Sequence, residues 1–168
     1  LLQRDGNRYR WELLENRNLT LQHLDTNEVL KTVRLGIECG RLPEDTGTDV
    51  PAILGKFGLL KDGVLNNAAA VLFGKHEDME YPQCLLRLAR FKGTDKTVFM
   101  DSQRIQGNFF QLLNAAMAFI FKHLSLSGTT DTLEREEHLT IPYKAIREGV
   151  LNSLTHRSYK EAGGSVGI

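Results

Sequence analysis

The chain has 168 residues, of which 41% are hydrophobic and 25% are charged, a composition typical of a soluble globular protein with one core or two small subdomains. Lysine plus arginine equal aspartate plus glutamate at 21 each, so the overall charge indicates neither a nucleic acid nor a membrane surface as partner. The two cysteines, Cys39 and Cys84, fit no zinc or redox spacing. No apolar run approaches a membrane span in length, and we expect a cytoplasmic protein.

The first third of the chain is expected to be mainly helical. Residues 1–22 are polar and irregular, which is typical of a linker or of the tail of a preceding domain. Residues 25–41 have apolar side chains at helical spacing and end near Gly40, so they predict a helix. Residues 50–60 predict a second, shorter helix with Pro51 in its first turn.

The middle of the chain is expected to supply strands. The run "AAAVLF" at 68–73 follows an Asp-Gly turn and has the length of a buried strand. Residues 84–93 alternate apolar and arginine side chains, which predicts a strand with one solvated face. Residues 96–107 are a third extended stretch.

Three arginines in these stretches are candidates for contacts with phosphate. Arg87 and Arg90 are expected on one face of a strand, and Arg104 is nearby in sequence. A plain solvated strand face is the simpler interpretation.

Two further helices are expected in the last third. Residues 108–124 are apolar on much of the helix surface and should lie between layers. A loop from 125 leads into a polar strand ending at Ile141, and Pro142 opens a final helix over 142–157. Another strand begins in "SVGI" at 165–168. The order of elements predicts an α/β (α+β) fold, in which a mixed sheet packs against helices.

The final helix carries a polar track. Glu148, Asn152 and His156 recur every fourth residue, which brings them to the same side of a helix. An aliphatic track should face the core: Ile146, Val150 and Leu154. Small residues lie between the two tracks: Ala145, Gly149 and Ser153. Such a strip allows a ligand, or merely another backbone, to approach closely.

The residue types in this track suit a nucleotide. Glu148 can accept a proton from water that attacks a phosphate. The carbonyl of Asn152 is a neutral oxygen ligand suited to Mg²⁺, whose coordination a triphosphate would complete. His156 and Arg157 could contact phosphate or a neighbouring loop. On spacing alone, an ordinary solvated helix face is the alternative.

Two stretches resemble motifs of one bacterial family. "IPYKAIREGVLNSLTHRSY" (141–159) and "FGLLKDGVLNNAAAVLFGK" (57–75) are similar to signatures of RecG-related proteins described as ATP-dependent DNA helicases or ATP-binding transcriptional regulators. "LLRLARFKG" and "RIQGNFFQLLNAAMAFI" follow in the order of the family. The resemblance covers residues 24–168.

The resemblance implies a domain order and a hydrolase function. Family members have a Schlafen AlbA-like domain, a middle region and a GHKL-type ATPase domain. On this basis, 1–22 would be a preceding tail, 23–128 the middle region with a winged-helix-like part at 50–93, and 129–168 the start of the ATPase domain. ATP hydrolysis would be coupled to a nucleic-acid or regulatory role.

The resemblance also implies roles for individual residues. Glu148 matches the general base and Asn152 the residue that coordinates magnesium, while His156 and Arg157 match a His-Arg pair of the family. The sequence departs from the family pattern at four positions: Asn66, Gly149, Ser153 and Ser158. The last of these replaces an aspartate, which puts an acidic role there in doubt.

The chain lacks the aspartate-glycine segment with which this class holds adenine, as well as its glycine-rich lid. It starts without methionine and stops within an expected strand, so we expect a fragment that binds ATP weakly or not at all. Two alternatives remain open: a non-enzymatic DNA-binding regulator that uses 50–93, and an interaction module that forms a homo-oligomer.

Overall fold

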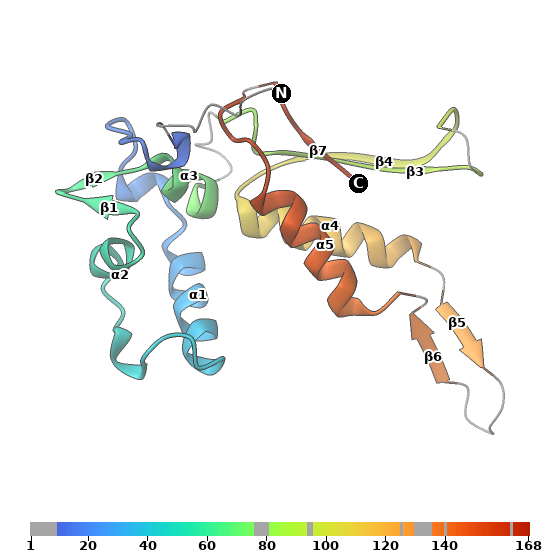
Figure 1. The fold of residues 1–168 in the computed structure, drawn as a ribbon, viewed down its shortest axis with the longest axis horizontal. Helices are drawn as coiled ribbons and strands as arrows, with labels where there is room; N and C mark the ends of the chain where they lie inside the picture. Colours follow the sequence, from blue (N-terminus) through green and yellow to red (C-terminus); the bar gives the residue numbers. More distant parts are fainter. Residues whose placement is uncertain are drawn as a thin grey trace, which may run out of the picture.

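A computed structural model describes residues 10–75, 81–93, 96–124, 126–129, 136–139, 141–161 and 163–168. It confirms an α/β fold in which helices pack against a mixed sheet (Figure 1). The described residues form two hydrophobic clusters, one among the N-terminal helices and one between the sheet and the last two long helices.

The N-terminal part consists of short elements. In chain order they are η1 (Trp11–Leu13), η2 (Leu21–His23), α1 (Thr26–Glu38), η3 (Glu44–Thr46), α2 (Val50–Lys56), β1 (Leu60–Lys61), β2 (Val64–Leu65) and α3 (Asn67–Phe73). The helix predicted at 25–41 is therefore α1, which begins where the Asp25 side chain accepts hydrogen bonds from the backbone N–H groups of Asn27 and Glu28. Gly40, with a φ of 65°, lies just beyond its end.

The strand predicted at 68–73 is wrong, because these residues form helix α3. Asn66 caps the helix by accepting a hydrogen bond from the N–H of Ala69 at 3.1 Å. The three alanines that follow have the highest helix propensity of any residue. The helix is buried on most sides, so its sequence shows no polar face, and a short apolar run of this kind cannot be told from a buried strand.

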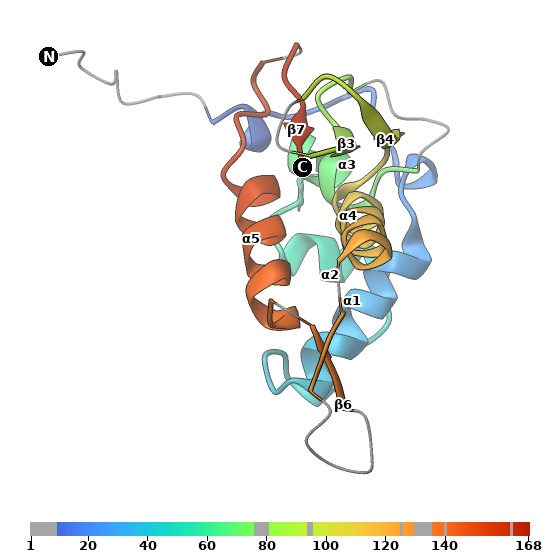
Figure 2. The same cartoon turned by 90° about the vertical axis from the view of Figure 1, so that its right-hand side faces the viewer.

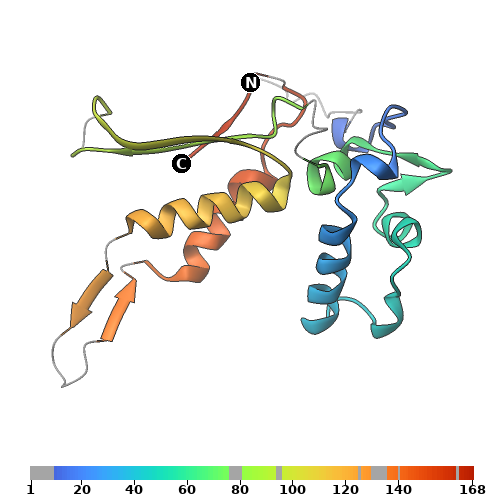
Figure 3. The same ribbon diagram turned by 180° about the vertical axis from the view of Figure 1, so that it is seen from behind.

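The sheet of the C-terminal part has the strand order β4–β3–β7. Strands β3 (Leu85–Phe91) and β4 (Phe99–Gln106) are antiparallel, whereas β7 (Val166–Gly167) runs parallel to β3. The strands expected from 84–93, 96–107 and 165–168 are thus confirmed. Helices α4 (Phe109–His123) and α5 (Tyr143–Thr155) both lie against one face of this sheet, as the view from behind makes clear (Figure 3).

A two-stranded hairpin extends beyond the ends of α4 and α5, away from the sheet (Figure 2). It pairs β5 (Leu126–Thr129) with β6 (Glu136–Leu139) in antiparallel register. The polar strand expected before Ile141 is β6, but the segment expected to be a loop also supplies its partner, β5.

The second hydrophobic cluster joins residues from β3, α4, α5 and β7. Its buried members are Leu86, Leu88, Leu112, Leu113, Ala116, Met117, Phe119, Val150, Leu154 and Val166. This core therefore contains residues from both sides of position 128, where the resemblance places a domain boundary. That boundary stays a prediction about a longer protein.

The two parts meet where α3 lies beside the start of α4. The rings of Phe73 and Phe110 stack at 5.6 Å between centroids. The side chain of Asn108, which caps α4, also donates a hydrogen bond to the Gly74 carbonyl at 3.0 Å. In the described part of the chain, every helix falls short of the length and hydrophobicity that a membrane span needs.

Candidate functional site on the last helix

Helix α5 has one side fixed in the core and the other side in solvent. Val150 and Leu154 are buried, and Ile146 packs against the same cluster, which confirms the predicted aliphatic track. Glu148 and Asn152 lie on the exposed side. Because the core fixes the rotation of the helix, the direction of this polar side is set by the sequence itself.

Glu148 and Asn152 contact each other directly. The side-chain amide nitrogen of Asn152 donates to Glu148 Oε1 at 3.2 Å. This bond leaves the carbonyl oxygen of Asn152 and the second carboxylate oxygen of Glu148 free to accept hydrogen bonds or to bind a cation. Among the described residues no three His, Cys, Asp or Glu side chains gather as a metal cluster. A hard cation here would take most of its ligands from phosphate oxygens and water.

The strip of small residues beside this pair is open. A Cβ atom added at Gly149 would meet nothing within 4 Å. Ser153 turns its hydroxyl back onto its own helix and donates to the Gly149 carbonyl at 2.8 Å. No other described part of the chain therefore requires the glycine, and the strip is free for a ligand to approach.

The predicted His-Arg pair separates at the end of α5. His156 ends the helix, where its N–H donates to the Asn152 carbonyl at 2.9 Å, and its side chain is exposed. The guanidinium of Arg157 instead donates to the carbonyl oxygens of Leu85 at 3.4 Å and of Gly164. It thereby ties α5 to the start of β3 and to the turn before β7.

The surroundings of Arg157 are largely dry. Burial raises the pKa of the neighbouring Cys84 thiol to about 12, although the positive charge of Arg157 acts in the opposite direction. Burial also raises the pKa of Tyr159 to about 12, and the Arg157 guanidinium lies 5.3 Å from the centre of its ring. In this structure Arg157 has a structural position, away from Glu148 and Asn152.

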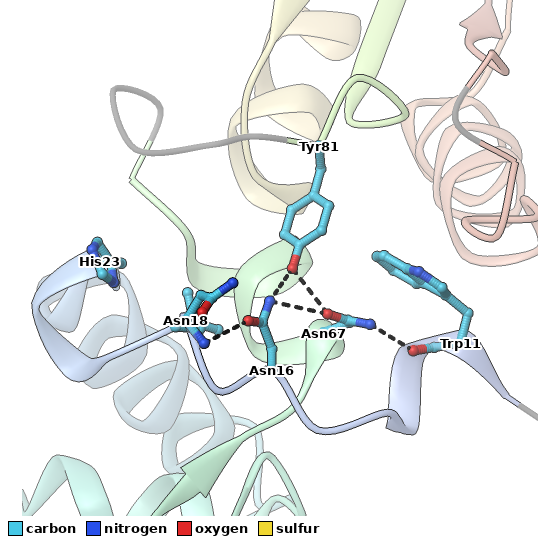
Figure 4. Close-up of a pocket in the computed structure, with 7 residues that line it drawn as sticks. Trp11, Asn16, Asn18, His23, Asn67 and Tyr81 are labelled. Atoms are coloured by element: carbon cyan, nitrogen blue, oxygen red, sulfur yellow. Dashed lines mark hydrogen bonds between the residues drawn. The ribbon is translucent and has the colours of Figure 1, made fainter.

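The structure also contains a polar cavity of about 360 Å³ that the sequence did not indicate (Figure 4). At its centre, Asn67 Oδ1 accepts from Asn16 at 3.1 Å and from the Tyr81 hydroxyl at 2.9 Å. The Asn67 side chain donates in turn to the Trp11 carbonyl at 3.0 Å. Asn16 and Tyr81 also contact each other. These bonds hold the segment before α1 against α3, so the network serves the fold.

Sequence reasoning missed this network for a simple reason. Asn16 and Asn67 are 51 positions apart, and no local spacing relates them. The available signal is the pair of asparagines in "LNNAAA", residues that are equally common in turns. The structure instead uses Asn66 as a helix cap and Asn67 as the hub of the network.

The expectation that Arg87 and Arg90 share a strand face is wrong, because residues three apart on a strand point to opposite faces. Arg90 lies on the helix side, where its guanidinium donates to His123 Nδ1 at 3.1 Å. His123 therefore donates from Nε2 to Asp101 Oδ2, at 2.8 Å. Arg87 lies on the other face, directly opposite Arg104 of β4.

Comparisons with known proteins add the fold alone. No family model matches the chain, and no curated protein matches it. The crystal structure of the DIP2311 protein from Corynebacterium diphtheriae is similar, with a TM-score of 0.65 at 15% sequence identity. The match covers 95% of this chain but only 30% of that one, so this chain corresponds to less than a third of that protein. At this identity the likeness supports a common fold and says nothing of activity.

Proposed function

We propose that this chain contributes the first half of an ATP site, with α5 as the helix that carries the catalytic residues. The observation that carries the proposal is the pair Glu148 and Asn152, exposed side by side at 3.2 Å on a helix whose opposite side is fixed in the core. Glu148 would act as the general base and Asn152 would coordinate Mg²⁺, in a protein that couples ATP hydrolysis to a nucleic-acid or regulatory role.

The residues present fit the chemistry of hydrolysis. A carboxylate on a fixed helix can orient a water molecule and accept its proton as the water attacks the γ-phosphate. The hydrogen bond from Asn152 restrains the Glu148 carboxylate without removing its second oxygen from solvent. Bound Mg²⁺ would neutralise charge on the phosphates, and the carbonyl oxygen of Asn152 is a suitable ligand for it.

The open strip at Gly149 gives a second line of support. Glycine inside a helix costs about 1 kcal/mol relative to alanine, yet the described neighbours do not need the space it leaves. A nucleotide lying along the helix would use that space.

Calorimetric titration with Mg-ATP tests the proposal. The 168-residue chain should bind weakly or not at all, because the proposal places the adenine-holding segment beyond Ile168. A longer chain that also contains such a segment should bind ATP and hydrolyse it. In that longer chain, Glu148→Gln should keep binding and lose about 10²- to 10⁴-fold in hydrolysis rate. Asn152→Ala should lose the magnesium-dependent part of binding.

Arg147→Gln is the matched control, since Arg147 is an exposed neighbour on the same helix but outside the polar track. It should leave both binding and hydrolysis unchanged. Tight binding by the 168-residue chain would contradict the proposed division of the site. Hydrolysis that survives Glu148→Gln would remove the assignment of the general base.

A further inference from the structure

A row of three residues crosses the whole sheet on the face that α4 and α5 leave uncovered. Arg104 of β4 pairs with Arg87 of β3, and Arg87 pairs with Gly167 of β7. Residues paired across neighbouring strands point to the same face. Asp101 of β4 shows which face this is. Its carboxylate accepts a hydrogen bond from His123 of α4, so it lies on the helix side, and Arg104, three residues further along the strand, points to the opposite face.

This face, which we call the open face, carries no acidic side chain at the described strand positions that form it. The row beside the arginines pairs Ala89 with Ser102, whereas the row on the other side pairs Leu85 with Gln106 and is covered, since Leu85 is buried. Arg87 and Arg104 are both exposed, and a Cβ atom added at Gly167 would meet nothing within 4 Å. No described helix lies over it in any of the three views (Figure 1).

The direct pairing of the two arginines destabilises the protein when no ligand is bound. Like charges directly opposite each other on antiparallel strands repel and destabilise the pair. Neither Arg87 nor Arg104 has a carboxylate partner among the described residues, whereas Arg90, on the helix side, donates to His123. An anion that lies over both guanidinium groups would remove the repulsion and accept paired hydrogen bonds from each.

We propose that the open face binds the phosphodiester backbone of a nucleic acid through Arg87 and Arg104. A small free anion would find only the two guanidinium groups as partners here, whereas a chain of phosphates can engage both arginines and continue along the sheet. The small side chain of Ala89 and the bare backbone at Gly167 let a sugar-phosphate chain lie close to the sheet. Contacts to phosphates carry no sequence information, so binding through the two arginines is independent of sequence. The next row along the strands pairs Phe91 with Phe99, whose ring centroids lie 4.7 Å apart and offer bases a stacking surface that also tolerates any sequence.

This proposal does not depend on the ATP site, and its test contains no nucleotide. Fluorescence anisotropy of a labelled oligonucleotide of mixed sequence, single-stranded and as a duplex, is measured over a salt series. We expect wild-type binding at low salt that weakens as salt increases. Arg87→Gln with Arg104→Gln should weaken it at least about tenfold and reduce the slope of log K against log salt by about 1.5, which corresponds to two phosphate contacts.

Two further variants separate binding from folding. Arg104→Glu should abolish binding and leave the melting temperature equal or higher, because it replaces a repulsive cross-strand pair with an attractive one. Arg34→Gln removes an exposed charge from α1, far from the open face, and should bind as the wild type does. Loss of binding in a variant that is at least as stable as the wild type assigns the effect to the surface itself.

Three results would overturn the proposal. One is no binding of either oligonucleotide at low salt. A second is unchanged binding by the double variant, or an equal loss with Arg34→Gln. The third is complete displacement by inorganic phosphate at a concentration equal to that of the oligonucleotide phosphates, which would assign the arginine pair to a free anion instead.

Discussion

The asparagine pair at the start of α3 and the polar pair on α5, one in each part of the molecule, are used in opposite ways. In the N-terminal part, Asn66 and Asn67 are buried and bonded: one caps α3 and the other joins Asn16, Tyr81 and the Trp11 carbonyl. In the C-terminal part, Asn108 and Arg157 are likewise bonded into the fold, but Glu148 and Asn152 lie on an uncovered side of α5. Among the described residues, the side chains of Glu148 and Asn152 form a hydrogen bond only with each other. The difference separates polar groups that hold the fold together from polar groups that remain available to a ligand.

The largest expected difference is in the reactivity of the two thiols. It tests whether water is excluded from the C-terminal core, although the outer faces of that part are polar. Cys39 is exposed at the end of α1, whereas Cys84 is buried just before β3. Burial raises the pKa of Cys84 from 9.0 to about 12, which lowers its thiolate fraction about a thousandfold at neutral pH. A thiol-reactive disulfide reagent at pH 8 should therefore titrate one cysteine promptly and the second only on unfolding.

Cys39→Ser should remove the prompt reaction, and Cys84→Ser should leave it intact. Prompt reaction of both thiols in the folded wild type would mean that the region around Arg157 and Cys84 opens to solvent readily.

The next largest expected difference is in the free energy of unfolding of two asparagine variants, one in each part. Asn67→Ala should destabilise the protein by about 1–3 kcal/mol, because it leaves the Asn16 amide, the Tyr81 hydroxyl and the Trp11 carbonyl without a shared partner. Asn152→Ala should change stability by no more than about 0.5 kcal/mol, since it removes one exposed bond. Urea unfolding followed by circular dichroism measures both.

The single tryptophan of the chain, Trp11, gives an independent local signal for this comparison. Its ring packs edge-on against Tyr81 at 5.3 Å and stacks with Tyr159 at 6.5 Å. Its emission should therefore shift in folded Asn67→Ala and stay unchanged in Asn152→Ala. Equal stability of the two variants would contradict the assignment of Asn67 as the hub of the network.

The same contrast explains what the sequence could predict. Helices α1, α4 and α5 each have a solvated side, so apolar spacing located them and put Glu148 and Asn152 on one side of α5. Helix α3 has almost no solvated side, so its residues predicted a buried strand. The network of Asn16, Asn67 and Tyr81 depends on chain folding over long separations, and the pairing of Arg87 with Arg104 depends on strand register. Neither leaves a local pattern in the sequence.

A smaller difference in stability is expected between substitutions of two glycines inside helices, one in each part. Gly149→Ala should stabilise the protein by about 0.5–1 kcal/mol, because the new methyl group meets no described neighbour and alanine favours the helix. Gly36→Ala in α1 should give no such gain, because its Cβ would lie 2.6 Å from Leu42 Cδ1. Thermal unfolding of both variants measures the difference.

The ATP proposal adds a condition to this comparison. In a longer chain that binds ATP, Gly149→Ala should weaken binding even though it stabilises the fold. A gain in stability with unchanged ATP affinity would show that the open strip is not used by the nucleotide.

The smallest effect concerns Asp101, which lies on the helix side of the sheet. The hydrogen bond from Lys122, followed by that from His123, lowers the pKa of this carboxyl below its usual 3.8. A carboxyl whose pKa is lower in the folded state stabilises the fold at pH values above about 4, and that contribution is lost as the pH falls through and below this value. Asp101→Asn should therefore reduce the drop in melting temperature between pH 6 and pH 3, whereas Glu38→Gln, an exposed change on α1, should not.

High salt should shrink this difference, because Lys122 is largely exposed and its attraction to Asp101 is screened. Asp101 and Arg104 lie on the same strand but on opposite faces of the sheet. Asp101→Asn should therefore change the acid stability without changing oligonucleotide binding, and Arg104→Gln, which adds no titratable group, should weaken oligonucleotide binding without changing the acid dependence of stability. A variant that changed both would mean that the two faces are coupled through β4, and the open face could then not be treated as an independent surface.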